Sequence, residues 1–94
     1  MLRPLDGPGV YGNISVTTTP IEVKVGSTAL DERSVITIQP IDGNVYYGYD
    51  NSVSSTTGTL IFEGQFFPLE ASDQLPVWLV SETGTVDVRI TEVS

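Results

Sequence analysis

The chain has 94 residues, no cysteine and no histidine, and its twelve acidic and four basic residues give a net charge of −8 at pH 7. This length fits one domain, and the lack of cysteine excludes disulfides and thiolate metal sites. Binding to nucleic acid or to an anionic membrane requires clustered lysine and arginine. The four basic residues are instead scattered, so we expect no nucleic acid and no membrane as partner: Arg3, Lys24, Arg33 and Arg89.

The first twelve residues are rich in proline and glycine, which disfavour regular structure. We predict an extended N-terminal arm over residues 1–12 and a single β-domain over residues 13–94. The start lacks the charged and apolar regions of a secretory signal, and no window approaches the roughly 18 apolar residues of a membrane span. We therefore expect a protein made in the cytoplasm.

The β-domain is dominated by alternation of apolar and polar residues with a period of two, which is typical of strands. In the last alternating segment, for example, Val86, Val88 and Ile90 are expected to point inward. Eight such segments follow one another at roughly ten-residue spacing, which predicts an all-β fold, a small antiparallel sandwich or barrel that is jelly-roll-like. The segments are 13–19, 21–25, 34–41, 44–49, 60–64, 65–70, 75–82 and 85–93.

Turn signals separate these segments. Asp42-Gly43 suits the positive φ angles of a type I′ turn, and Gly64-Gln65 and Thr83-Gly84 lie at similar breaks. We predict that each of the three joins a hairpin. Residues 27–33 are expected to form one helical turn or a plain turn, and Pro40 predicts that its strand leaves the ladder or runs along an edge.

Catalytic residues are not indicated. Histidine and cysteine, the usual general base and thiol nucleophile, are missing, and a serine nucleophile would need Lys24, which is predicted to face solvent. Asp31 and Glu32 are neighbours in a turn, and the other acidic residues are interpreted as solvated charge on outward strand positions and loops. We predict no enzyme, and retain a small hydrolase with paired carboxylates as a competing hypothesis.

Metal and cofactor sites are not indicated either. Residues 42–44 and 50–52 offer oxygen ligands of the kind that calcium prefers. Neither stretch has the spacing of a calcium loop, and both lie where turns favour Asp and Asn. We predict no metal and no cofactor.

The aromatic residues are the main candidates for binding. In a strand, Tyr47 and Tyr49 share one face and Tyr46 takes the other, so the three cannot form one platform. Phe66 and Phe67 are likewise split, and Trp78 lies on the opposite face from Val77 and Leu79. Two readings remain open: core plus subunit interface, since a strand that is apolar on both faces must be covered twice, or a sugar-binding platform.

The segment from Arg33 nearly to the end, "RSVITIQPIDGNVYYGYDNSVSSTTGTLIFEGQFFPLEASDQLPVWLVSETGTVDVRITE", resembles small structural proteins of tailed-bacteriophage virions. The similarity lies in "VYYGYDNSVSSTTGTLI", the Gly-plus-aromatic step "EGQFFPL", the strand "VWLVSETG" and the closing "TVDVRITE". Related proteins usually have "IQN" where this chain has "IQP", so Pro40 departs from the pattern.

The resemblance implies a β-sandwich or β-barrel that packs on a virion, most commonly as a head decoration (cement) protein. Such proteins often form trimers on the outer capsid surface and hold neighbouring major capsid proteins together. We therefore expect a homotrimer whose partner is the major capsid protein. The alternative is a tail, neck or fibre component that binds a glycan or receptor. The residues expected at the interface are Leu2, Leu5, Val10, Tyr11, Tyr46, Tyr49, Phe67 and Trp78.

Overall fold

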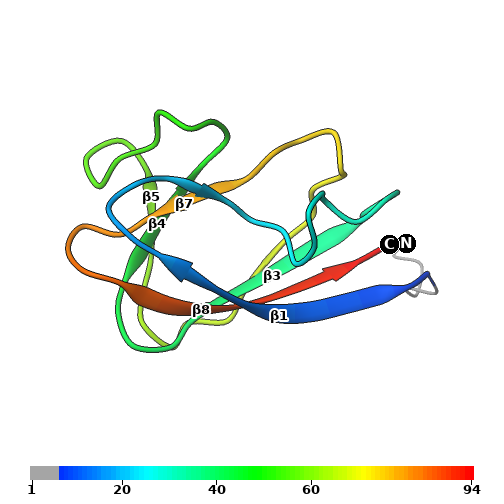
Figure 1. The fold of residues 1–94 in the computed structure, drawn as a ribbon, viewed down its shortest axis with the longest axis horizontal. Helices are drawn as coiled ribbons and strands as arrows, with labels where there is room; N and C mark the ends of the chain where they lie inside the picture. Colours follow the sequence, from blue (N-terminus) through cyan, green and yellow to red (C-terminus); the bar gives the residue numbers. More distant parts are fainter. Residues whose placement is uncertain (1–6) are drawn as a thin grey trace.

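The computed structural model describes residues 7–94, which form two four-stranded antiparallel sheets (Figure 1). Sheet A has the order β1-β8-β3-β6 and sheet B the order β2-β7-β4-β5. The strands are β1 (Gly9–Val16), β2 (Ile21–Glu22), β3 (Val35–Pro40), β4 (Val45–Gly48), β5 (Thr59–Ile61), β6 (Phe67–Leu69), β7 (Trp78–Val80) and β8 (Val86–Val93).

The strand pairing is that of a jelly roll. β1 pairs with β8, β2 with β7, β3 with β6 and β4 with β5, so the chain is paired as one long hairpin that has been rolled into two sheets. This nested pairing generates the two Greek keys of a double-sheet jelly roll. The predicted fold class, an eight-stranded jelly-roll-like sandwich, is confirmed.

The core lies between the sheets and follows the predicted alternation. Along β8 every second residue is buried, and in β3 Ile36 and Ile38 are fully buried while Val35, Thr37 and Gln39 are only half-buried. Branched aliphatic side chains dominate because they pack well on a pleated surface. The buried cluster consists of Val16, Val23, Ile36, Ile38, Val45, Ile61, Ala71, Val77, Leu79, Val86, Val88 and Ile90.

The three predicted hairpins are wrong. β3 and β4, β5 and β6, and β7 and β8 each lie in different sheets, so the connections between them cross the sandwich and do not turn back within one sheet. Gly43 lacks the positive φ of a type I′ turn, whereas Gly64 and Gly84 have φ of 79° and 67°. Among the strands of residues 7–94, only β4 and β5 are both consecutive and paired.

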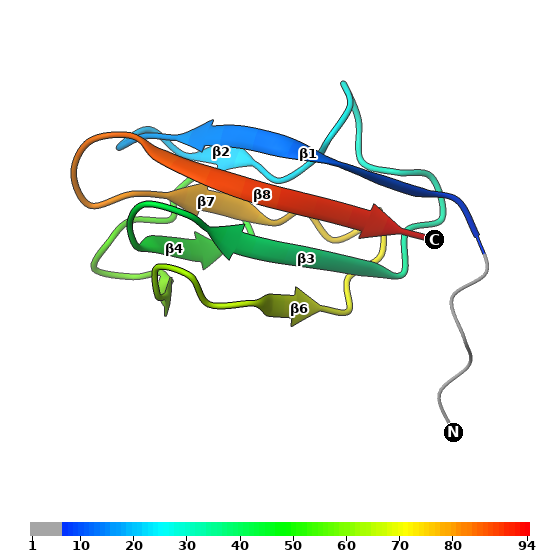
Figure 2. The same ribbon diagram turned by 90° about the horizontal axis from the view of Figure 1, so that it is seen from below.

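The connections gather at two ends of the sandwich (Figure 2). At the turn end, the connections 17–20, 41–44, 62–66 and 81–85 approach one another, since Ser81 N donates to Thr17 O at 2.9 Å and Gly64 N donates to Pro40 O at 2.7 Å. At the ion-pair end, the connections 23–34 and 70–77 lie beside the C-terminal part of β8.

The predicted bounds of the arm differ from the structure, whereas a turn over residues 27–33 is present. β1 begins at Gly9 and pairs with β8 along its whole length, so residues 9–12 belong to sheet A and not to an arm, while residues 1–6 lie outside the described residues. Residues 27–33 take the second of the two predicted forms, a plain turn in which Arg33 N donates to Leu30 O at 3.1 Å. Pro40 closes β3 opposite Val88, beyond the part of β3 that pairs with β6.

Candidate interaction surfaces

The outer face of sheet B is covered by the chain's own loop 49–58. Val53 in this loop is 7% exposed and lies over β4, because a Cβ added at Gly48 would be only 2.8 Å from Val53 Cγ2. The register places Tyr46 beside Val80 and Gly48 beside Trp78 on this face. The two glycines beneath Val53, Gly48 and Gly58, give it the room to approach the sheet.

β7 is apolar on both faces, and the chain itself covers both of them. Leu79 faces the core, and Val80 on the other face is buried without belonging to the core cluster. Burial of Val80 therefore requires no second subunit, because it is already complete within the single chain. Trp78 is half-buried at the same face.

The outer face of sheet A carries no such cover. Tyr11 is 84% exposed and lies beside a shallow depression of about 620 Å³ that Asn13, Gln39 and Arg89 also line. Asn13 Nδ2 donates to Asp87 Oδ1 at 3.1 Å, and Arg89 Nε lies 3.4 Å from Asp87 Oδ2. These contacts orient the polar side chains across the face, so that one aromatic ring stands beside several hydrogen-bonding groups.

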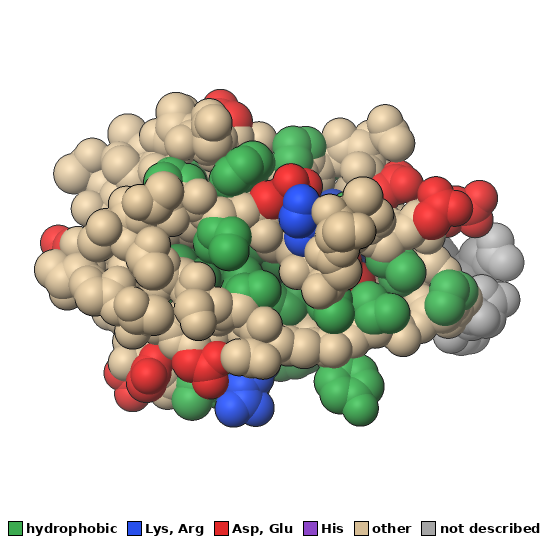
Figure 3. Space-filling model, in the orientation of Figure 1, with side chains coloured by type: hydrophobic (Ala, Val, Ile, Leu, Met, Phe, Trp, Pro, Cys, Tyr) green, Lys and Arg blue, Asp and Glu red, His purple; other side chains and the backbone are tan. Residues whose placement is uncertain are grey.

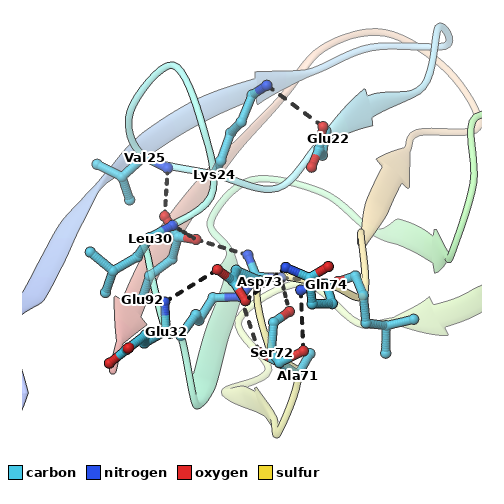
Figure 4. A network of polar contacts seen from close by, with 12 residues as sticks. Glu22, Lys24, Val25, Leu30, Glu32, Ala71, Ser72, Asp73, Gln74 and Glu92 are labelled. Atoms are coloured by element: carbon cyan, nitrogen blue, oxygen red, sulfur yellow. Dashed lines mark hydrogen bonds and ion pairs between the residues drawn. The ribbon is translucent and has the colours of Figure 1, made fainter.

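A buried ion pair lies between the two sheets at the ion-pair end of the sandwich. Arg33 Nη1 lies 2.8 Å from Glu92 Oε2, and both side chains are almost fully buried. Glu92 also accepts hydrogen bonds from Val25 N at 2.9 Å and Leu30 N at 3.2 Å (Figure 4). Arg33 donates further to three carbonyls of the connection 70–77, those of Ala71, Ser72 and Leu75, at 2.7–3.0 Å.

The network has a structural role. Every buried side-chain nitrogen and oxygen among residues 7–94 has a hydrogen-bond partner, so neither charge is left free to act on a ligand. The two side chains join two connections to β8. Glu92 corrects the expectation that the acidic residues lie on outward strand positions and loops, since it occupies an inward position of β8.

The turn end presents two exposed phenylalanines. Phe62 is 60% exposed and Phe66 is 63% exposed, and we call residues 62–66 the aromatic loop. Its backbone is held in place: Gly64 N donates to Pro40 O at 2.7 Å, Glu63 N to Asn44 Oδ1 at 2.7 Å, and Gln65 N to Phe62 O at 3.0 Å. The loop therefore offers large apolar side chains on a backbone that is already ordered.

The charges on the surface are mostly acidic. Figure 3 shows acidic side chains in several separate groups on the visible face and few basic ones. Arg33 is buried, Lys24 lies 3.6 Å from Glu22, and Arg89 lies beside Asp87. Each basic residue described is thus next to a carboxylate, which leaves the net negative charge to dominate the outer surface.

The stretches considered as calcium ligands serve as turns. Asp42 Oδ1 accepts a hydrogen bond from Asp87 N at 2.9 Å, and Asn44 accepts from Glu63. Asp50 accepts from the side chain and the backbone N–H of Ser52, and these two hydrogen bonds lower the pKa of the exposed Asp50 carboxyl. Within residues 7–94, no three His, Cys, Asp or Glu side chains are grouped as metal ligands. The same part of the chain holds no helix with the length and hydrophobicity of a membrane span.

The expected interface residues do not form one surface. Leu2 and Leu5 lie outside the described residues, Tyr11 is on the outer face of sheet A, and Val10 is half-buried on the other side of β1. The remaining four lie in different places: Tyr46 and Trp78 on the outer face of sheet B, Tyr49 edge-on to Tyr47 at 6.1 Å, and Phe67 half-buried against the core, 5.1 Å from Tyr47.

The phenylalanines of the aromatic loop were missed by the sequence prediction. Of the neighbours Phe66 and Phe67, the exposed one is Phe66, whereas Phe67 had been selected. A usable signal was present, since Phe62 and Phe66 flank the turn residues "EGQ" and a connection of this kind runs over the surface.

Comparison with known proteins does not assign the chain to a family. No protein-family model matches the chain, and no curated protein matches its sequence.

Proposed function

We propose that this protein is a decoration protein of a tailed-bacteriophage head, which binds the outer surface of the assembled shell and adds contacts between major capsid proteins. The resemblance in sequence suggests the class, and the aromatic loop is the observation that carries the proposal. Viral capsid domains and lectin domains both use the jelly roll, so the fold is compatible with this role without selecting it. The role is mechanical and requires no cofactor, and the trimer implied by the resemblance stays a prediction.

The aromatic loop has the properties of a docking element. Aromatic residues are enriched in interfaces, and fully burying a phenylalanine contributes about 1.5–3 kcal/mol. Phe62 and Phe66 are both mostly exposed, so this contribution is available to a partner. Because hydrogen bonds to Pro40 and Asn44 already hold the backbone, binding orders little additional chain.

The charge of the molecule supports an outer location. A net charge of −8 disfavours contact with packaged DNA and favours a basic protein surface. A protein of this kind would be made in the host cytoplasm and join the finished shell. Because it binds the assembled shell and not the separated subunits, it would stabilise the shell by mass action.

The test is co-sedimentation with heads assembled from the major capsid protein of the same phage. We expect the wild-type chain to bind, and the double variant Phe62→Ser/Phe66→Ser to bind at least about tenfold more weakly, as for an interface hot spot. Leu75→Ser, an exposed apolar residue of the ion-pair end, is the matched control and should bind normally. Urea unfolding should show each variant within about 0.5 kcal/mol of the wild type.

The possible outcomes test the decoration role and the use of the aromatic loop separately. A wild-type chain that does not bind the heads contradicts the decoration role. Normal binding by the double variant, in contrast, leaves the role intact and removes the aromatic loop from the contact.

A second function is favoured by the outer face of sheet A. Tyr11 stands beside Asn13, Gln39 and Arg89, and an aromatic ring next to planar hydrogen-bonding groups is suited to a sugar. In this alternative the protein is a tail, neck or fibre component that binds a host glycan. Titration of the intrinsic fluorescence with host-surface oligosaccharides tests it, since Tyr11→Ala should abolish any response.

A further inference from the structure

The free edge of β1 is the longest sheet edge in the described part of the chain. The edge strands are β1 and β6 in sheet A and β2 and β5 in sheet B. β2, β5 and β6 have only two or three residues, and Pro68 in β6 has no N–H to donate. β1 has eight residues and contains neither proline nor lysine, two of the protections that natural edge strands use.

The ladder to β8 shows which backbone groups of β1 face outward. Ser94 N donates to Pro8 O at 3.0 Å, one step beyond the Gly9–Val93 pair. Bonded and non-bonded pairs alternate in an antiparallel ladder, so the even-numbered residues of β1 bond to β8 and the odd-numbered ones point their N–H and C=O away. A second hydrogen bond gives the same assignment. Ile41 N donates to Asp87 O, so the odd-numbered residues of β8 direct their backbone groups toward β3 and not toward β1.

Four residues therefore present free backbone groups along this edge: Gly9, Tyr11, Asn13 and Ser15. Among residues 7–94, no backbone hydrogen bond reaches their N–H or C=O groups. Their side chains are exposed on the outer face of sheet A, and the residues between them face the core side.

A second copy of the chain can occupy this edge because β1 itself carries no charge that would oppose it. The protein carries a net charge of −8, so most surfaces of two copies repel each other. The sequence of β1, GVYGNISV, contains no charged residue. Pairing β1 with β1 therefore places no like charges directly opposite each other.

We propose that two copies associate by antiparallel pairing of their β1 edges around a twofold axis at Gly12, which joins two sheets A into one continuous eight-stranded sheet. In this register Tyr11 lies opposite Asn13 of the second copy, and Gly9 lies opposite its Ser15. All four outward N–H and all four outward C=O groups of each edge find a partner. In this register the core-side residues of one copy also lie opposite core-side residues of the other, as Val10 does opposite Ile14.

This contact does not depend on the proposed capsid role, but in solution it is an alternative to the trimer that the resemblance implies, and the two differ in mass. The monomer has a mass of 10.1 kDa, so light scattering after size exclusion should give about 20 kDa at high concentration and about 10 kDa after dilution, from mass action. A mass of about 30 kDa, or a monomer at millimolar concentration, would overturn the proposal.

The edge itself is tested with a pair of variants at one position. Asn13→Pro removes an outward N–H that β8 does not use, and Gly12 before it tolerates a following proline best. We expect the dimer dissociation constant to rise at least about tenfold, because two intermolecular hydrogen bonds are lost. Asn13→Ala loses the same side chain but keeps the N–H, and should dimerise normally.

Hydrogen exchange of the wild-type chain provides a second measurement that does not depend on folding of the proline variant. The amides of Tyr11 and Asn13 should be protected at high concentration and exchange quickly after dilution. Those of Gly12 and Ile14, which bond to β8, should stay protected throughout. Protection of both sets at every concentration, or dimers of undiminished affinity for Asn13→Pro, would refute the edge contact.

Discussion

The two ends of the sandwich are closed by different means. At the ion-pair end, two long connections are joined to β8 by Arg33 and Glu92, whose charges are buried 2.8 Å apart. At the turn end, shorter connections are held by backbone hydrogen bonds and by side chains such as Asp42 and Asn44, and all of these groups are near solvent. A buried charge has no alternative partner when its counterion is removed, whereas an exposed group can return to water.

This difference assigns separate tasks to the two ends. The ion-pair end uses its polar side chains internally, for the fold. The turn end leaves most of the Phe62 and Phe66 side chains exposed, where they are free to contact a partner. Substitutions of the buried charges Arg33 and Glu92 should therefore change stability, and substitutions of Phe62 and Phe66 should change binding.

The largest effect is expected from breaking the buried ion pair. Arg33→Met leaves the Glu92 carboxylate buried without its cation, and should lower the free energy of unfolding by about 3–5 kcal/mol. The same is expected of Glu92→Gln, which leaves the guanidinium without its anion. For a chain whose total stability is about 5–15 kcal/mol, either change is severe, and urea unfolding measures it.

A double variant serves as the control for this prediction. Arg33→Met/Glu92→Leu removes both charges, and should destabilise the protein less than the two single changes added together. A single variant that costs less than about 1 kcal/mol would show that the ion pair does not hold the two connections.

A smaller effect is expected at the turn end. Gly84 has a φ of 67°, a left-handed conformation that costs other residues about 1–2 kcal/mol. A Cβ at this position meets no atom within 4 Å, so Gly84→Ala should lower the free energy of unfolding by that conformational term alone. The shift in thermal midpoint measures the effect.

Gly26, in a connection of the ion-pair end, is the matched control. It has no positive φ, and an added Cβ would lie in ordinary contact at 3.8 Å from Thr28 O. Gly26→Ala should therefore be neutral or slightly stabilising, because it restricts the unfolded chain. If the two substitutions cost the same, the left-handed turn at Gly84 does not constrain this end.

The sequence predicted the strands but not their partners. Period-two alternation located all eight strands, because burial of one sheet face imposes that pattern wherever the strand is paired. It could not tell a connection that turns back from one that crosses to the other sheet. Asp42-Gly43 illustrates this: the dipeptide does form a turn, but the Asp42 side chain accepts a hydrogen bond from Asp87 N in β8, and β4 continues in the other sheet.

The polar core and the loop over sheet B were also beyond prediction from the pattern. Alternation along β8 places Glu92 inward, but its partner Arg33 is 59 residues away and precedes a strand, so no local spacing connects them. Val53 is the single apolar residue in a polar stretch, and its burial depends on the two glycines beneath it. Both features arise from contacts between distant segments.

The smallest effect concerns loop 49–58, in which Val53 lies over the outer face of sheet B. The Ser52 hydroxyl, and then the Ser52 backbone N–H, donate to Asp50 and hold the pKa of its carboxyl below the ordinary value. Ser52→Ala removes the first donor and keeps the second, so the pKa of Asp50 should rise part of the way back. Carboxyl-carbon NMR titration measures this shift, with Ser55→Ala as a control that leaves both donors in place.

The sign of the pH dependence follows from the lowered pKa. Because the folded state binds the Asp50 proton more weakly than the unfolded chain, this interaction stabilises the fold above the unfolded pKa and is lost as the pH falls through the folded value. Asp50 is fully exposed, so the change should appear in the titration of this one carboxyl before any loss of the fold. A pKa of Asp50 that is the same in wild type and Ser52→Ala would mean that the loop does not hold this turn in solution, and that Val53 reaches the outer face of sheet B without it.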